Sequence, residues 1–323
     1  MPRAADPFWT ASCGWDIICD MAISRRQFAQ ITGASVAGAA RLTAQRRHLT
    51  ALQVIEHVQK NLGVPWQTET LDGFKAGEPS TEISGVATTA MATMDVLSRA
   101  AREKTNLVLT LEPVFFGRLD GQASLSAPPG AGRGMAGISP DDPVFLAKKE
   151  FIQKNGLVVF RFYDNWRNRK PDPFATGLAL TMGWTKHQAA GDPLRYDIPA
   201  ITIETLAGSL AARLKARAGI RVVGDPQSRV RRIAVLPGVS ALAATMKALP
   251  DCDLVVAGET REWESVEYAQ DTVASGQKKG LILLGRVLSE ETGMNVCADW
   301  LKKLIPDVPV RWLPVGDPYW RPA

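Results

Sequence analysis

Residues 233–259 read IAVLPGVSALAATMKALPDCDLVVAGE, and this stretch decides the fold class. Two short apolar runs, at 233–236 and 254–257, enclose a helix-length segment at 240–249. Apolar runs of this length, bounded by Pro, Gly and Asp, are typical of buried strands. Because parallel strands need a long crossover between them, the order strand, helix, strand predicts a largely parallel sheet covered by helices.

The same order of elements continues in both directions along the chain. Toward the C-terminus the expected strands are 281–284 and 310–313, and the expected helices are 263–275 and 290–304. Toward the N-terminus the expected strands are 83–87, 106–110 and 157–162, with a helix over 90–104. The sequence therefore predicts an α/β protein whose sheets are parallel or mixed and flanked by helices.

Irregular stretches divide the chain into parts. Residues 118–142 are rich in Gly, Pro, Ala and Ser without periodicity, which predicts a loop. A polar break at 225–232 favours a domain boundary between residues 205 and 232. The expected parts are a leader at 1–45, a first α/β subdomain at 46–205 and a second at 206–323.

A twin-arginine signal is expected in the leader. Ser-Arg-Arg-Gln-Phe at 24–28 matches the twin-arginine pattern, and the uncharged, Ala- and Gly-rich residues 29–40 follow it. That stretch is too short to remain as a stable membrane span, so we expect cleavage near residues 40–46 and a periplasmic protein translated from Met21. The alternative is a cytoplasmic protein whose basic N-terminus is not a working signal.

The composition argues against some other classes of protein. The net charge is +5 over 323 residues and the basic side chains are spread along the chain, so no nucleic-acid partner is expected. The four cysteines lack the close paired spacing of a zinc site or a redox motif. Two of them lie in the leader, and the sequence leaves open whether the other two, Cys252 and Cys297, form a disulfide.

Acidic residues follow four of the expected strands. In open parallel sheets, ligands bind at the carboxyl ends of the strands. The acidic residues at these positions are Glu112, Asp164, Glu259 and Glu290. Carboxylates in one cleft repel each other unless a cation or a proton compensates, so the pattern indicates a hard metal ion or a raised pKa. The alternative is that each carboxylate caps the helix that follows it.

The same strand ends resemble the Nif-three-like family, also called dinuclear metal-centre hexameric proteins. Residues 106–116 read NLVLTLEPVFF, where the family has His-His-Pro or His-Glu-Pro at a strand end. Residues 160–167 read FRFYDNWR, where the family has a His and an Asp after a strand. Residues 285–290 read GRVLSE, which follows the family's Gly-His-x-x-Ser/Thr-Glu except at the histidine. The turn at Gly258 and Glu259 is also similar.

The resemblance implies a two-domain α/β subunit, a ring-shaped homo-hexamer and two bound divalent metal ions such as zinc, manganese or magnesium. The carboxylates at its metal positions are Glu112, Asp164 and Glu290, with Glu259 as a further site residue. The residues where histidines are expected are Leu111, Tyr163 and Arg286. Because Leu has no ligand atom and Arg brings a permanent positive charge, the metal centre is expected to be altered or vestigial.

Two functions are consistent with such a site. An exported Nif-three-like protein that holds one hard ion on its carboxylates would be a metal-dependent hydrolase, cyclohydrolase-like by the family's label, acting through an activated water. A relative without metal would be a non-enzymatic, oligomeric binding or scaffold protein. Arg286 is expected to lie within reach of Glu112 or Glu290 and to suppress metal binding there.

Overall fold

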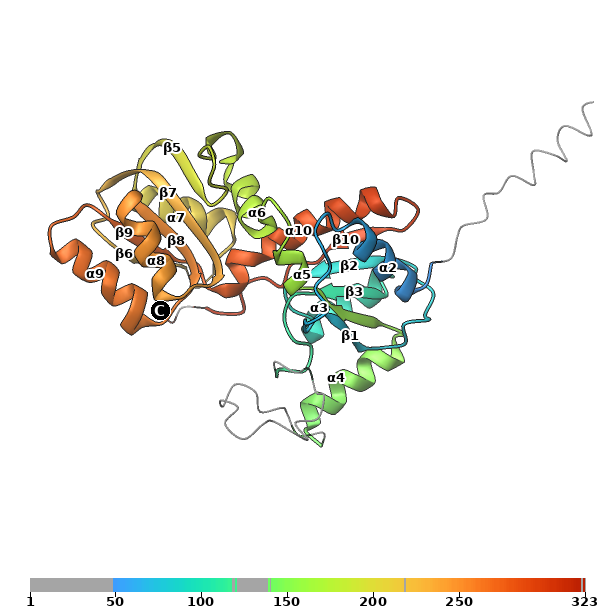
Figure 1. The fold of residues 1–323 in the computed structure, drawn as a ribbon. Coiled ribbons are helices and arrows are strands. Elements are labelled where there is room, and N and C mark those ends of the chain that lie inside the picture. The colour runs from blue at the N-terminus through green and yellow to red at the C-terminus, as the bar shows by residue number, and fades with distance from the viewer. Residues whose placement is uncertain are drawn as a thin grey trace, which may run out of the picture. The chain divides into compact units, whose positions relative to one another are not determined.

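The structure is a computed structural model, and it describes residues 49–117, 120, 139, 141–217, 219–320 and 322. The expected leader and most of the expected loop at 118–142 lie outside these residues. The described chain forms two five-stranded sheets flanked by helices (Figure 1), which confirms the α/β class. Within these ranges, no helix combines the length and the apolar character needed to cross a membrane.

The first sheet has the strand order β1-β4-β3-β2-β10. Its strands are β1 (Gly73–Ala76), β2 (Val86–Thr89), β3 (Leu107–Thr110), β4 (Val158–Arg161) and β10 (Val310–Trp312). β1 pairs antiparallel with β4, and the other pairs are parallel. The helices of this part are α2 (Ala51–Asn61), α3 (Met94–Arg102), α4 (Pro143–Lys154), the short α5 (Asp164–Arg167) and α10 (Arg286–Leu304), which also contacts the second sheet.

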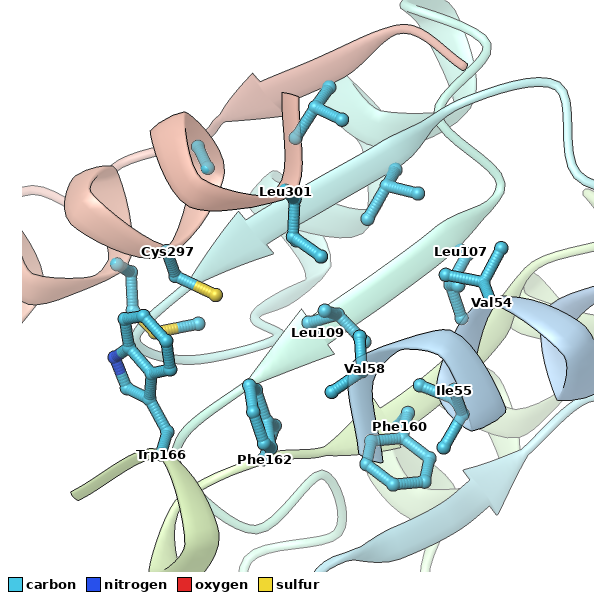
Figure 2. Packing of buried hydrophobic residues seen from close by; sticks show 14 of the residues in the cluster. Val54, Ile55, Val58, Leu107, Leu109, Phe160, Phe162, Trp166, Cys297 and Leu301 are labelled. Carbon is cyan, nitrogen blue, oxygen red and sulfur yellow. The ribbon is translucent and has the colours of Figure 1, made fainter. Parts of the chain in front are cut away.

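The side chains of β3 are buried on both faces of the first sheet. Leu107 and Leu109 pack in the core formed by α2 and α10, whereas Val108 packs in the core formed by α3 and α4. Successive residues of a strand point to opposite faces, so a strand covered on both sides reads as a continuous apolar run. Figure 2 shows the first of these cores, with Val58 of α2 and Leu301 of α10 beside Leu109.

The second sheet has the strand order β5-β7-β8-β9-β6. Its strands are β5 (Arg195–Thr202), β6 (Arg221–Val223), β7 (Arg229–Val239), β8 (Leu254–Glu259) and β9 (Gly280–Leu283). The three central strands are parallel and both edge strands are antiparallel to their neighbours. The helices are α6 (Pro173–Met182), α7 (Ile203–Arg213), α8 (Leu242–Ala248) and α9 (Glu267–Ala274), with shorter turns η2 (Thr185–His187), η3 (Leu249–Asp251) and the π-helical η4 (Glu262–Val266).

Two cores cover the faces of the second sheet. α6 and α7 pack on one face, and α8 and α9 pack on the other. α10 begins in the first of these cores with Leu288 and continues into the α2 core with Met294 and Leu301. α10 therefore follows β9 of the second sheet and packs against the first sheet.

The division between the sheets does not follow the expected boundary between subdomains 46–205 and 206–323. β5, at 195–202, is an edge strand of the second sheet. The strand expected at 310–313 forms, but it pairs parallel with β2 of the first sheet. An apolar run predicts that a strand forms but not which strand it pairs with. For residues 310–313 the pairing partner depends on where α10 places the following chain.

The other differences concern the edge strands β1 and β6, which the sequence did not predict, and the helices. The helix expected at 290–304 begins earlier, at Arg286, and the one expected at 263–275 starts as the π-helical η4. The helices that the sequence did not predict are α2, α4, α5, α6 and α7. Cys252 and Cys297, whose pairing the sequence left open, are both free and lie in different cores.

Candidate functional site

The buried carboxylate of Glu290 is the centre of a cluster of charged side chains. Gly285, with φ of +86°, turns the chain from β9 into α10 and places Glu290 in the early part of that helix. The Glu290 side chain is 1% exposed. Tyr163, two residues after the end of β4, donates a hydrogen bond from its hydroxyl to Oε1 at 3.0 Å, and Arg167 of α5 donates one from Nη1 at 2.9 Å. Arg167 also donates from Nη2 to the Pro237 carbonyl at 3.1 Å.

Arg286 joins Glu290 to a second carboxylate, that of Glu112. Its Nε lies 2.5 Å from Oε1 of Glu112 and 3.7 Å from Oε2 of Glu290. Its guanidinium carbon lies 5.7 Å from the centre of the Tyr163 ring, within the range of a cation–π contact. These contacts confirm that Arg286 lies within reach of both carboxylates.

Burial is the largest single influence on the pKa of each ionisable group described in this cluster. It raises the pKa of Glu290 to about 7, although Arg167, Tyr163 and Arg286 favour the charged form. Burial likewise raises the pKa of Glu112 despite the nearby Arg286. The pKa of the Tyr163 hydroxyl rises to about 12 through burial and the negative charge of Glu290. Burial alone would lower the pKa of Arg286, but the two carboxylates raise it overall. Glu290 is therefore the member of this cluster that can exchange a proton near pH 7.

Two glycines of the second sheet make room for the cluster. A Cβ atom on Gly238, whose φ is +78°, would overlap Oε1 of Glu290. A Cβ atom on Gly258 would overlap the Ser289 hydroxyl and the Gly238 backbone. The Ser289 hydroxyl accepts a hydrogen bond from the Gly238 N–H at 2.9 Å and donates one to the Arg286 carbonyl at 2.7 Å. The end of β7 is thus fixed against the start of α10.

Three of the residues expected at the site are not part of the cluster. Asp164 accepts hydrogen bonds from the Thr70 hydroxyl at 2.7 Å and from the Leu71 N–H at 3.1 Å, so it holds the segment before β1. Leu111 is 1% exposed and belongs to the α2 core. Glu259 is exposed at the end of β8. The expected residues that meet are Glu112, Tyr163, Arg286 and Glu290.

The sequence interpretation missed Arg167 and Gly238. Arg167 follows Tyr163 by one helical turn, a spacing that places two side chains on the same side of a helix. That spacing was a usable signal for Arg167. For Gly238 no local signal exists, because the residue that it makes room for, Glu290, lies in another element.

The donor set does not fit the dinuclear centre that the Nif-three-like resemblance implies. The Tyr163 hydroxyl is engaged with Glu290, and the cation of Arg286 contacts both carboxylates that could serve as ligands. In the described ranges, no group of three or more His, Cys, Asp or Glu side chains is arranged to hold a metal ion. The arrangement instead pairs two carboxylates with two guanidinium groups.

A cavity of about 570 Å³ lies at the ends of β7 and β8. Its polar lining residues include Ser240, Glu259, Thr260 and Arg261. The Ser240 hydroxyl oxygen is buried and has no hydrogen-bond partner among the residues described. Glu259 lines this cavity, and its negative charge also contributes to the raised pKa of Arg286 and of Glu112.

Comparison with solved structures places the fold among the NIF3-related proteins. Staphylococcus aureus protein SA1388 matches with a TM-score of 0.62 at 15% identity, over 85% of this chain and 99% of that one. A Bacillus cereus protein related to NIF3 matches with a TM-score of 0.62 at 13% identity, over 85% of this chain and 100% of that one. Protein ybgI, of unknown function, matches with a TM-score of 0.61 at 16% identity, over 84% and 100%. No protein-family model and no curated protein sequence matches the chain.

Proposed function

We propose that this chain is a divergent Nif-three-like protein that works without a bound metal and binds a small polar molecule. The observation that carries the proposal is the position of Arg286, between Glu112 and Glu290. A guanidinium is permanently charged at physiological pH, so it compensates the two carboxylates as a metal ion would. A divalent cation entering the same space would have to displace Arg286 and overcome its repulsion.

Arg167 strengthens this compensation. Its guanidinium donates to Glu290 and is held by the Pro237 carbonyl, so the buried carboxylate already has a charged partner on each side. Breaking a buried ion pair is costly because an uncompensated charge remains. Metal binding would break at least the contacts of Arg286.

The cavity at the ends of β7 and β8 supplies the binding site in this proposal. Its volume of about 570 Å³ falls within the range of about 300–1,000 Å³ that is common for small-molecule sites. The unpartnered Ser240 hydroxyl and the charged Glu259 and Arg261 offer both donors and acceptors. A small molecule with hydroxyl, amide or charged groups matches this lining.

Metal content and metal affinity test the proposal. We expect less than stoichiometric zinc, manganese or magnesium by elemental analysis after dialysis, and no tight binding by calorimetry. Arg286→His removes the cation and adds a neutral nitrogen ligand above a pH of about 6.5, so it should strengthen metal binding at least tenfold, or about 1.4 kcal/mol. Arg221→His is the matched control, because Arg221 of β6 pairs with Glu262 and belongs neither to the cluster nor to the cavity lining.

Either of two results would contradict a metal-free site. One is a parent protein that retains a stoichiometric divalent metal, and the other is an equal metal affinity for Arg286→His, Arg221→His and the parent.

A metal-dependent hydrolase is the second candidate, and the convergence of Glu112 and Glu290 on one point favours it. If Arg286 moved aside, these carboxylates could hold one hard ion of zinc, manganese or magnesium. This candidate requires hydrolysis that depends on added metal and is lost in Glu290→Gln. Metal-independent ligand binding without hydrolysis would favour the first candidate.

Export and self-association complete the proposal. The twin-arginine pattern at 24–28 supports a periplasmic location. The family resemblance supports a homo-oligomer, with a ring hexamer as the expected form. Light scattering of the purified chain would measure its mass in solution.

A further inference from the structure

A second cavity, of about 250 Å³, lies between α10 and the segment that joins α5 to α6. Its lining includes Trp166, Arg169, Lys170, Asp299, Trp300 and Lys303. Asp299, Trp300 and Lys303 share one face of α10, because residues three and four apart lie on the same side of a helix. None of the cluster residues around Glu290 lines this cavity, so it is separate from the site described above.

Arg169 lies against two tryptophan rings that contact each other, with their centres 5.5 Å apart. Its guanidinium carbon lies 4.7 Å from the centre of the Trp300 ring and 5.3 Å from that of Trp166. Contacts with the rings restrict the guanidinium group, and they use none of its hydrogen-bonding capacity toward oxygen acceptors. Arg169 is partly buried, and this burial lowers the pKa of its guanidinium. It forms no ion pair or hydrogen bond through its side chain with any residue that the structure describes.

Trp166 provides a second donor without a partner. The residue is fully buried, and its indole Nε1 has no hydrogen-bond partner among the described residues. An indole nitrogen can only donate, and buried donors are nearly always paired in folded proteins. Trp166 lines the cavity, so an acceptor bound there is a candidate partner for this group.

The charged residues of the lining are mostly positive. Lys170 and Lys303 add two cations to that of Arg169. Asp299 is the acidic residue of the lining, and its Oδ1 is paired with Lys302 at 2.8 Å. The cavity therefore has an excess of positive charge together with buried donors.

We propose that this cavity binds the oxyanion group, phosphate or sulfate, of a small ligand. The planar guanidinium of Arg169 can donate two parallel hydrogen bonds to such a group, and the lysines supply further charge. The volume of about 250 Å³ is below the range of about 300–1,000 Å³ typical of drug-sized ligands, so a whole nucleotide is not expected to enter.

Calorimetric titration of the full chain with sodium phosphate at low, constant ionic strength tests this site. Sodium chloride and sodium acetate serve as comparison anions. We expect phosphate to bind at one site per chain and to change the tryptophan fluorescence, since Trp166 and Trp300 line the cavity. Arg169→Gln should weaken phosphate binding at least tenfold, and Lys303→Ala at least threefold.

Lys154→Ala is the matched control, because Lys154 and Lys303 each lie in the last turn of a helix but only Lys303 lines the cavity. Circular dichroism checks that Arg169→Gln is folded. If it is not, the exposed Lys303 provides the decisive comparison.

Three results would overturn the assignment. They are an absence of phosphate binding by the folded parent, an equal affinity for Lys303→Ala and Lys154→Ala, and acetate binding as tight as that of phosphate.

Discussion

Gly238 lies directly against the carboxylate of Glu290, so that a Cβ atom at residue 238 would overlap Oε1. The two residues come from β7 and α10, and the Gly238 N–H donates to the hydroxyl of Ser289, the residue before Glu290. The φ of +78° at Gly238 adds a second requirement for glycine, because L side chains rarely adopt this conformation. The position of the Glu290 carboxylate thus depends on the absence of a side chain at residue 238.

Gly238→Ala should destabilise the protein by about 2–3 kcal/mol, because it combines backbone strain with overlap at a buried carboxylate. Gly276→Ala is the matched control: Gly276 also has positive φ, +87°, but a Cβ there has no neighbour within 4 Å. Only the strain, of about 1 kcal/mol, is expected for it. Urea unfolding of both variants measures the difference, and equal losses would mean that the contact with Glu290 does not matter.

Glu290 should make stability depend on pH. The pKa of its carboxyl is about 7 in the folded protein, against 4.5 for an unperturbed group. Between these values the folded state keeps the proton that the unfolded state releases. The contribution of Glu290 to the free energy of unfolding is therefore greatest below pH 4.5 and decreases as the pH rises to 7, by up to about 3 kcal/mol.

Urea unfolding of the parent and of Glu290→Gln at pH 5 and pH 7.5 measures this effect. The parent should lose more stability than the variant between the two values. Glu56→Gln, on the exposed side of α2, controls for the loss of a carboxylate. Parallel behaviour of the parent and Glu290→Gln would show that Glu290 does not change its charge in this range.

Two helical glycines should respond in opposite directions to the same substitution. A Cβ on Gly177 of α6 would overlap the backbone of Thr292 in α10, whereas one on Gly208 of α7 has no neighbour within 4 Å. Gly177→Ala should cost about 1–3 kcal/mol through overpacking. Gly208→Ala should gain about 0.5–1 kcal/mol from the higher helix propensity of alanine. Thermal unfolding measures both, and a stabilising Gly177→Ala would be incompatible with the close approach of α6 and α10.

Export should depend on the two arginines of the leader. Arg25 and Arg26, which lie outside the described residues, form the centre of the twin-arginine pattern. Replacing both by lysine keeps the charge but removes the guanidinium groups, so export should stop. Arg41→Lys, in the same leader, is the control and should leave export unchanged. Fractionation measures it, and normal periplasmic levels of the double variant would contradict the predicted location.

The sequence predicted the strands better than their partners. The apolar run that became β3 was predicted from its composition, because a strand covered by helices on both faces is apolar along its whole length. The strand at 310–313 was predicted equally well, yet its pairing with β2 was not. Pairing is a long-range property, and the local pattern of apolar residues carries no record of it.

The functional site was predicted in part for the same reason. Glu112, Tyr163, Arg286 and Glu290 each follow a strand, and the rule that parallel strands end at one edge brought them together in prediction. Asp164 satisfies the same rule, but its carboxylate accepts hydrogen bonds from the Leu71 N–H and the Thr70 hydroxyl instead. The position of a residue relative to a strand determines where its backbone lies. The hydrogen-bond donors nearby determine which partner its side chain contacts.

By itself the sequence determined the class of fold, the strand-end positions of the acidic residues and the arginine in place of an expected histidine. These depend on local periodicity and on residue identity, which a sequence records directly. The tertiary structure decided that Arg286 lies 2.5 Å from Glu112, that Arg167 holds Glu290, and that Arg169 lies against the paired rings of Trp166 and Trp300. Such relationships join residues far apart in the chain, and burial then sets their charge states, so only the packed fold could decide them.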